Sequence, residues 1–522
     1  HRDLDDYTPP ADRDAGRHCR AQAEGVVVAG VPLGGARFAR DFAHERLDAH
    51  MLAHQRVRVL RCVQSAYIIV RYCLALRFVH LLRGCGQVLR VRDDDRDSPV
   101  ARHDSVFRDT LAALLTRADL YERRAAATAQ GFHGRVFRQA ALPPKLGGVA
   151  LACADAVCES AFLACTLACL VYLRAHGRLL RAPVDLSERC ALPMFDALRL
   201  AHARLRTDSV ASVQDLSHLL SGSTPPPQRV LSEGVWDKRQ ALVRAEQPDR
   251  RERTRVCSAA GQHAGAWLGA VPVSDRLRAL PRSYQLALCM RLGVEISDLA
   301  ELPRPALCVC GAAHDAFGWH PSVCRKGNRE NAWTVRHDTV QWALIWVLRR
   351  LRGNVSAVGK RDMFGSAAMA TVGRALHADI VAYHWRAPGR HLWVDVAVTT
   401  PDTAEALRAG SAEVSGTAAR LRERKKHSKY GATVDRVGGC FRAGVMERFG
   451  AVGDDMQAMV RGACGDLDRD RGEEDWAFSA PSQVTYYMQH IVLAGVMADA
   501  AMVDAAIEAD VYRRDLGAVR AG

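Results

Sequence analysis

Apolar residues recur at helical spacing through most of the first half of the chain. Between residues 36 and 82 they return every three or four positions, and the same spacing covers roughly 103–139 and 150–176. One face of each segment is therefore apolar, as expected for a helix packed on a core. The pattern predicts a mainly helical region, preceded by a short strand and a Gly-Pro turn at 25–35 and interrupted by the stiff turn LPPKLGGV at 142–149.

A different pattern, alternation of apolar and other residues, occupies the two runs LHADIVAY and HLWVDVAVTTP. Alternation predicts β-strands. The polar gap between the runs contains Pro388-Gly389, which predicts a turn. The two runs are therefore expected to form a β-hairpin. Each strand carries one carboxylate, Asp379 in the first and Asp395 sixteen positions later in the second.

Helical spacing returns on both sides of this hairpin. Before it, a helix ending near residue 352 is predicted, with a buried stripe formed by Val335, Thr339, Trp342 and Trp346. After it, a helix over about 411–429 and a strand over 432–437 are predicted. The resulting order is helix, two strands, helix and strand.

The two hairpin carboxylates suggest a bound cation, because charged groups are unfavourable in half-buried strands. Two carboxylate oxygens suit Mg²⁺, which retains water and also accepts phosphate ligands. Only seven of the 72 Lys and Arg residues are lysines, and three of the seven are Lys425, Lys426 and Lys429. This clustering indicates a need for compact ammonium groups. The alternative is a hairpin whose aspartates face solvent beside a solvated basic helix.

A cysteine and histidine cluster precedes the hairpin. Its spacing, C-x-C-x9-H-x3-C, is formed by Cys308, Cys310, His320 and Cys324. Zinc takes four nitrogen or sulfur ligands in a tetrahedron, and one ion can fold a segment that lacks a large core. The spacing therefore predicts a structural zinc site. His314 is a competing fourth ligand, and free cysteines in a loop are the alternative.

Charge and cysteine usage narrow the class of partner. The formal net charge is +14 and the pI is about 9.2, which favours a polyanion such as nucleic acid. The most apolar run, 160–173, is short for a membrane span and predicts a buried helix. Sixteen scattered cysteines are typical of a reduced intracellular protein.

Gly453-Asp454-Asp455 is like a polymerase GDD motif, but the apolar residues after it keep helical spacing, so the two acids are predicted to open a helix.

The hairpin and its basic helix resemble the PD-(D/E)XK nuclease core. Ala378-Asp379 stands at the Pro-Asp position, and Asp395-Val396-Ala397 has alanine where that core has lysine. The resemblance is closest to the restriction-like endonuclease at the C-terminal end of some non-LTR retrotransposon reverse transcriptases. There the lysine lies on the following helix in a K-x-x-K-Y-like segment, which residues 426–430 match. That family also places a Cys/His zinc motif just upstream, and residues 30–34 and 142–151 are similar to its segments after the polymerase palm.

The resemblance implies a Mg²⁺-dependent endonuclease that nicks target DNA so that the nick primes reverse transcription. Asp379 and Asp395 would bind Mg²⁺, and Lys426 or Lys429 would orient water and stabilise charge on the scissile phosphate. No segment matches well the catalytic Asp-Asp motif of the polymerase. The expected partners are target DNA and element RNA, with no membrane and no small-molecule substrate, and the expected location is the nucleus. Phosphate contacts are expected from Arg325, Lys326, Arg329, Arg336, His337, Arg422, Arg424 and Lys425.

The expected fold is an α+β multidomain protein. It has a mostly helical N-terminal half, a small zinc module and an α/β restriction-endonuclease-like core with a mixed sheet. Two rival functions remain: a decayed nuclease that still binds nucleic acid through its zinc module, and a helical interaction protein with no nucleic-acid role. The expected segments are a loose stretch (1–24), a helical region following a polymerase palm (25–220), a linker (221–262), a helical segment (263–306), the zinc module (307–330), the nuclease core (331–470) and C-terminal helices (471–522).

Overall fold

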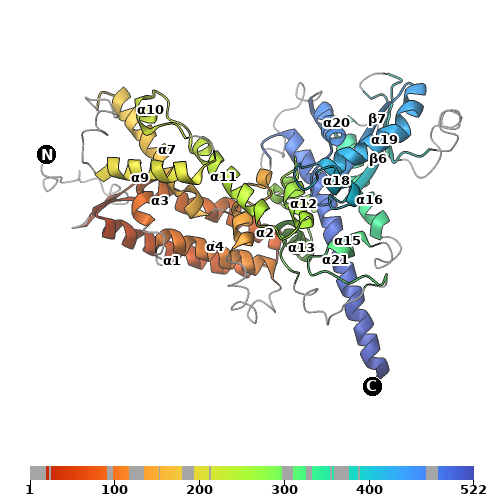
Figure 1. Ribbon diagram of the computed structural model, residues 1–522, viewed down its shortest axis with the longest axis horizontal. Helices are drawn as coiled ribbons and strands as arrows, with labels where there is room; N and C mark the ends of the chain where they lie inside the picture. Colours follow the sequence, from red (N-terminus) through yellow and green to blue (C-terminus); the bar gives the residue numbers. More distant parts are fainter. Residues whose placement is uncertain are drawn as a thin grey trace. The chain divides into compact units, whose positions relative to one another are not determined.

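The computed structural model shows a mostly helical protein with two small sheets (Figure 1). The chain divides into two compact units. The first comprises His1–Val59, Ile69–Thr110 and Leu151–Arg239, and the second comprises Leu60–Ile68, Leu111–Ala150 and Gln240–Gly522. The structure describes residues 19–22, 25–90, 98–116, 134–151, 153–178, 193–210, 213–296, 308, 310–324, 332–352, 355–357, 376–385, 388–465 and 480–521.

The first unit combines a three-stranded antiparallel sheet with packed helices. Three helices, α2 (Val63–Ile69), α4 (Pro99–Leu115) and α11 (Gln228–Ala245), contribute residues to both units. The other elements of the first unit are β1 (Cys19–Gln22), β2 (Gly25–Val28), β3 (Val31–Gly34), α1 (Ala36–Arg58), η3 (Val70–Leu74), α3 (Ala75–Leu89), α7 (Ala154–Ala175), α9 (Pro193–Asp208) and α10 (Leu216–Ser221).

The segment at 25–35 forms a β-hairpin rather than the single strand predicted. Val28 of β2 pairs with Val31 of β3, so the turn consists of Ala29 and Gly30 alone. Both turn residues have positive φ, 49° and 79°. Two-residue hairpin turns require such values because their twist then matches that of the strands. A Gly-Pro turn was predicted in this segment, but the turn is formed by Ala29 and Gly30, and Pro32 lies in β3. Alanine rarely takes positive φ, so the sequence does not mark this turn.

The core face of α1 differs from the predicted stripe. Phe38 and Leu47 are buried as expected, but Leu52 is exposed. His50 and His54 take the buried positions of the next turns and meet His103 and Phe107 of α4. The Nε2 atoms of His50 and His54 have no hydrogen-bond partner within the described ranges. The core of this unit thus contains polar imidazoles that the apolar spacing does not identify.

Burial of these imidazoles makes the first unit sensitive to acid. Burial, with nearby His103 and Arg77, lowers the pKa of His50 from 6.5 to about 4. Burial, with His50, His103 and Arg58, lowers the pKa of His54 to about 3. A base whose folded pKa is depressed stabilises the fold above its unfolded pKa and loses that contribution as pH falls below it.

The first unit should therefore open more readily at pH 5 than at pH 7. His50 alone is expected to contribute a loss of about 2 kcal/mol over this interval. Hydrogen exchange of α1 and α3 peptides in the full chain, corrected for intrinsic exchange rates, measures the effect. The His50→Leu variant should show a smaller difference between the two pH values. Equal corrected protection at both pH values in the wild type would contradict the expectation.

The second unit contains the four-stranded sheet and the C-terminal helices. Its elements are α6 (Arg135–Ala141), η4 (Pro144–Leu146), α12 (Arg250–Ala259), η5 (Ala266–Gly269), η6 (Asp275–Leu277), α13 (Pro281–Leu292), α15 (Trp319–Val323), α16 (Ala332–Arg352), β4 (Val355–Ala357), β5 (Ile380–Ala382), β6 (Leu392–Thr399), α18 (Ala404–Arg408), α19 (Thr417–Arg436), β7 (Cys440–Glu447), α20 (Asp454–Gly465) and α21 (Gln483–Ala521).

Residues 221–262, expected to form a linker, contain α11 and α12 instead. Arg255 of α12 is fully buried and donates to Glu252, Gln139 and the carbonyl of Arg291. Arg291 is also buried and donates to four carbonyl groups, including those of residues 144 and 148 in the predicted stiff turn. Arg255, a charged residue of the expected linker, therefore lies in the interior of this unit together with Arg291.

The second sheet is mixed and has the order β4-β5-β6-β7. The first two pairings are antiparallel and the last, between β6 and β7, is parallel. Helix α19 covers one face, where Tyr430 and Val434 join a cluster with Trp393 and Phe441 (Figure 1). On the other face, Leu344 of α16 lies with β6 residues around Gly444. The predicted mainly helical chain with a small mixed sheet is confirmed.

Two details of this sheet and its helices were predicted wrongly. Helix α19 continues to Arg436, and the last strand begins at Cys440 rather than at 432. Tyr430, Thr433 and Val434 are buried at helical spacing, and the helix stops where Gly438 takes a φ of 68°. The buried face of α16 is formed by Val340, Leu344, Val347, Leu348 and Leu351.

Val335 and Trp342, two of the four residues in the expected buried stripe of α16, are more than half exposed. This helix carries apolar residues on two faces. Spacing alone cannot select the one that meets the sheet.

Within the described residues, three helical stretches are long and apolar enough to cross a membrane when judged by length and composition alone. They are Val63–Leu89, Ala154–Ala175 and Gln483–Ala509. The expectation that no membrane is involved stays a prediction.

Candidate functional site

Asp379 directly precedes β5, and Asp395 lies in the neighbouring strand β6. Ile380 pairs with Val394, and the Asp379 N–H donates to the Val394 carbonyl at 2.9 Å. Residues 379 and 380 therefore both face Val394, and the regular ladder ends at Ile380. The predicted hairpin is confirmed, although β5 is shorter than the alternating run because its regular pairing begins at Ile380.

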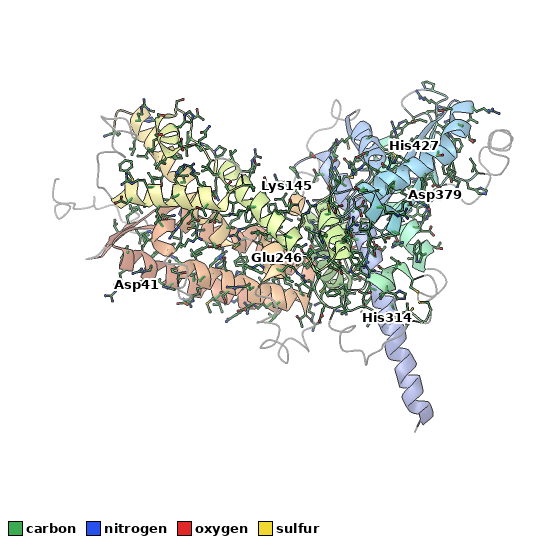
Figure 2. All side chains as sticks on the ribbon, in the orientation of Figure 1. Asp41, Lys145, Glu246, His314, Asp379 and His427 are labelled. Carbon is green, nitrogen blue, oxygen red and sulfur yellow. The ribbon has the colours of Figure 1, made fainter. Side chains whose placement is uncertain are left out.

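The Asp379 carboxylate, whose position Figure 2 labels, is held by both β6 and α16. Its Oδ2 accepts a hydrogen bond of 2.6 Å from the Val396 N–H and lies 3.1 Å from His337 Nε2. Gln341 Nε2 donates to the Asp379 carbonyl at 2.7 Å. The side chain keeps 23% of its surface exposed. This carboxylate is thus fixed in direction yet remains accessible from solvent.

Asp395 lies deeper and faces α19. Its Oδ2 pairs with the Lys426 ammonium, and its Oδ1 lies 3.0 Å from Tyr430 Oη. Lys426 Nζ also lies 3.3 Å from the Val396 carbonyl oxygen. Burial lowers the pKa of Lys426 from 10.5 to about 8, against the opposing effect of Asp379 and with the aid of Lys429. Of the three clustered lysines, Lys426 is the one that reaches a hairpin carboxylate.

Lys429 contacts Tyr430, which in turn contacts Asp395. Its Nζ lies 2.8 Å from Tyr430 Oη and 4.4 Å from the centre of the same ring. Tyr430 Oη is also 2.6 Å from the His377 carbonyl oxygen. Tyr430 was noted only as the end of the K-x-x-K-Y segment, but it contacts Asp395 directly. Its position four residues after Lys426, on the same helical face, was the available signal.

His337 belongs to the carboxylate site rather than to a phosphate-binding surface. Its Nδ1 lies 3.0 Å from Asp338 Oδ1 and its Nε2 faces Asp379. The hydrogen bond to Asp379, together with Asp338, raises the pKa of His337 above its usual value. Only the fold of α16 against the sheet edge could bring this ring to Asp379.

The expected phosphate-contacting residues differ in their surroundings. Arg422, Arg424 and Lys425 are exposed on α19, and Lys425 pairs with Glu405. Arg336 was wrongly placed on the surface, because it is buried and donates to Asp499 at 2.7 Å. The remaining three, Arg325, Lys326 and Arg329, lie outside the described residues.

The predicted cysteine and histidine ligands converge. One ligand atom from each of Cys308, Cys310, His320 and Cys324 lies within 4.8 Å of the others, so the cluster can hold a metal ion. The Sγ atoms of Cys308 and Cys324 are 3.5 Å apart, and Cys310 Sγ is 3.3 Å from His320 Nε2. Metal–ligand bonds of about 2.0–2.3 Å in a tetrahedron separate ligand atoms by about 3.5–3.8 Å. His320, not the competing His314 labelled in Figure 2, completes the set.

Hydrogen bonds to backbone N–H groups fix the shape of the loop that carries the four ligands. Asp315 accepts from the N–H groups of Trp319 and His320, which fixes the short helix α15 that carries His320. The Trp319 indole is buried and donates to Glu252 of α12 at 2.8 Å. The ligand loop is thereby attached to the interior of the second unit. Among the described residues, this cluster is the group of three or more His, Cys, Asp or Glu side chains with geometry for a metal.

Comparisons with known proteins give no family assignment. No protein-family model matches the sequence, and no curated protein matches it significantly. The functional assignment therefore depends on the residues and their geometry.

Proposed function

We propose that the chain is a Mg²⁺-dependent endonuclease that hydrolyses phosphodiester bonds in DNA. The observation that carries the proposal is that Asp379 and Lys426, which pairs with Asp395, both contact the main chain of Val396. Two carboxylates from adjacent strands beside an ammonium group are costly to bury unless a charged ligand or transition state uses them.

The donor set suits Mg²⁺. Asp379 and Asp395 supply two carboxylate oxygens, and the Val396 carbonyl oxygen faces the same lysine. Mg²⁺ prefers oxygen ligands and is commonly held by one or two carboxylates together with water and phosphate. Bound there, it would activate water for attack and offset the charge of the reacting phosphate.

The chain's own groups would orient the reaction. Lys426 is anchored on Asp395, from where its ammonium would orient the attacking water or stabilise charge on the phosphate. Tyr430 would hold the Asp395 carboxylate in its direction, and Lys429 would position Tyr430. His337 would fix the second carboxylate, Asp379. Lys426 thus takes the place of the lysine that Ala397 lacks.

Nucleic-acid binding would use exposed basic groups and the metal cluster. Arg422, Arg424 and Lys425 point outward from the helix that carries Lys426. Such contacts to phosphates give affinity that falls with salt. Zn²⁺ is the ion that three thiolates and one imidazole favour, and at Cys308, Cys310, His320 and Cys324 it would hold the loop in a single shape.

The resemblance to non-LTR retrotransposon proteins supplies the biological setting of the proposal. In that setting the chain is the C-terminal portion of a reverse transcriptase. The enzyme acts in the nucleus on target DNA together with element RNA, and its nick primes reverse transcription. The lysine on the helix after the hairpin and the upstream cysteine and histidine cluster support this assignment.

Nicking of supercoiled plasmid by the purified full chain tests the proposal. We expect conversion to the relaxed form with Mg²⁺, and none with EDTA or with Ca²⁺ in place of Mg²⁺. The decayed-nuclease alternative predicts salt-sensitive DNA binding with no nicking in any divalent metal. The helical interaction alternative predicts no nicking and no salt-sensitive DNA binding. Binding to DNA that does not weaken from low to moderate salt would favour this alternative.

A further inference from the structure

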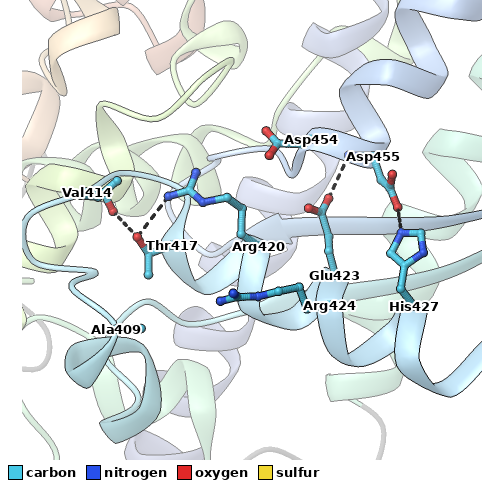
Figure 3. Close-up of a pocket in the computed structure, with 9 residues that line it drawn as sticks. All are labelled: Ala409, Val414, Thr417, Arg420, Glu423, Arg424, His427, Asp454 and Asp455. Atoms are coloured by element: carbon cyan, nitrogen blue, oxygen red, sulfur yellow. Dashed lines mark hydrogen bonds and ion pairs between the residues drawn. The ribbon is translucent and has the colours of Figure 1, made fainter.

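A second polar site lies on another face of the helix that carries Lys426. Figure 3 shows a pocket of about 580 Å³ bordered by α19, the start of α20 and the loop before α19. This volume falls within the range of about 300–1,000 Å³ that small-molecule sites occupy. At 3.6 residues per turn, Arg420 and Arg424 project between a third and a half turn away from Lys426. The pocket is therefore separate from the hairpin carboxylates.

One wall of the pocket is cationic. Arg420 and Arg424 lie one turn apart, and both side chains extend along the pocket (Figure 3). Arg420 donates to the Ser415 carbonyl at 2.9 Å and to Thr417 Oγ1 at 3.2 Å, which fixes its direction. Within the described parts of the chain, neither guanidinium has a carboxylate within 4 Å. Like charges at this spacing destabilise a helix, so the pair indicates an anionic ligand.

Carboxylates also line the pocket: they belong to Glu423, Asp454 and Asp455. Asp455 is committed, because it accepts from the Ala443 N–H at 2.9 Å and pairs with Arg442 and His427. Glu423 accepts from the Asp455 N–H, and burial raises its pKa to about 7, so about half of this carboxyl group is protonated near neutral pH. Asp454 is exposed at the start of α20 and lines the pocket.

The pocket also has an apolar part. Ala409 and Val414 line it, and Val414 exposes 55% of its surface. A ligand complementary to these side chains has an anionic group, a flat apolar body and a hydrogen-bond donor. A nucleotide whose base carries an exocyclic amino group has these three features.

We infer that this pocket holds one nucleotide of a nucleic-acid strand, turned out of the base stack. Its phosphate lies between Arg420 and Arg424, its base lies against Val414, and an exocyclic amino group donates to Asp454. The choice of a nucleic-acid strand as the source rests on the proposed nuclease function. The phosphate and amino-group chemistry rests on the pocket alone. Bidentate guanidinium contacts and a carboxylate that accepts from cytosine N4 are established modes of recognition.

Calorimetric titration of the full chain with CMP, UMP and inorganic phosphate tests the pocket. CMP should bind about fivefold more tightly than UMP, since one hydrogen bond to Asp454 distinguishes them. The Arg424→Gln variant should weaken CMP at least about fivefold. The Arg436→Gln variant, which removes the same charge from an exposed position near the end of α19, should bind CMP as the wild type does. The Asp454→Asn variant should lose the preference for CMP over UMP.

Three results would overturn the inference: no saturable CMP binding by the wild type, equal weakening in the Arg424→Gln and Arg436→Gln variants, or equal affinities for CMP and UMP. An unpaired oligonucleotide should displace CMP and a fully paired duplex should not, which separates a strand from a free nucleotide as the source. Displacement by neither would leave a mononucleotide site and would overturn the assignment to a strand. The Asp395→Asn variant should still bind CMP, so failure of the nuclease proposal is measured separately.

Discussion

Replacement of Asp395 by asparagine should lower Mg²⁺-dependent plasmid nicking at least about 1,000-fold, which corresponds to about 4 kcal/mol of transition-state stabilisation. Asparagine keeps the shape of the side chain and a hydrogen-bond acceptor for Tyr430. It removes the negative charge that would bind the metal and that pairs with Lys426. Asp379→Asn should have an effect of the same order. Initial rates of nicking, measured at saturating enzyme, give the comparison.

The matched control is Asp435→Asn, an exposed aspartate on α19. Its nicking rate should equal that of the wild type within about twofold, because surface substitutions away from a site have small effects. Thermal unfolding of all three variants checks that folding is retained. If the Asp395→Asn variant nicks as fast as the Asp435→Asn variant, the carboxylates are not catalytic and any activity comes from elsewhere.

Removal of the metal ion from the cysteine and histidine cluster should produce the largest change in stability. Structural zinc contributes about 10 kcal/mol or more to small zinc modules. Loss of the ion should also destabilise the interior of the second unit, because Trp319 packs between Arg251 and Arg448 and donates to Glu252. We expect chelation, or the Cys310→Ser substitution, to lower the unfolding temperature of the second unit by at least about 5 °C. Elemental analysis should give one zinc ion per wild-type chain.

The Cys440→Ser variant is the control for this experiment. Cys440 is half-buried like Cys310 but lies at the start of β7, outside the ligand cluster. It should keep its zinc and unfold within about 1–2 °C of the wild type. Wild-type protein that contains no zinc and is unaffected by chelators would show that the four side chains meet without an ion. The nuclease proposal would survive that result, since its carboxylates are separate residues.

The lysine proposed as catalytic comes from outside the strand motif. In the strand motif Asp395-Val396-Ala397, the third position lacks an amine, and by local sequence the site looks incomplete. Helix α19 packs on the same face of the sheet and delivers Lys426 to Asp395 from 31 residues further along the chain. Chemistry at such a site depends on where the ammonium group lies rather than on which element carries it.

Several features followed from the sequence by itself. Periodicity identified the helices around residues 36–82 and 150–176 and the hairpin at 376–399, because local spacing decides which face of an element is apolar. Spacing also selected Cys308, Cys310, His320 and Cys324, since a short loop restricts which side chains can meet. Alternation along both strands indicated that Asp379 and Asp395 would be neighbours.

Tertiary structure decided which charged groups are surface and which are interior. Arg255, Arg291 and Arg336 are indistinguishable in sequence from the exposed arginines of α19, yet buried acceptors hold each of them. The choice of Lys426 over Lys429 and the contact of His337 with Asp379 likewise depend on packing between segments far apart in the chain. Local spacing fixes direction within one element. Only the packing of elements fixes which atoms finally meet.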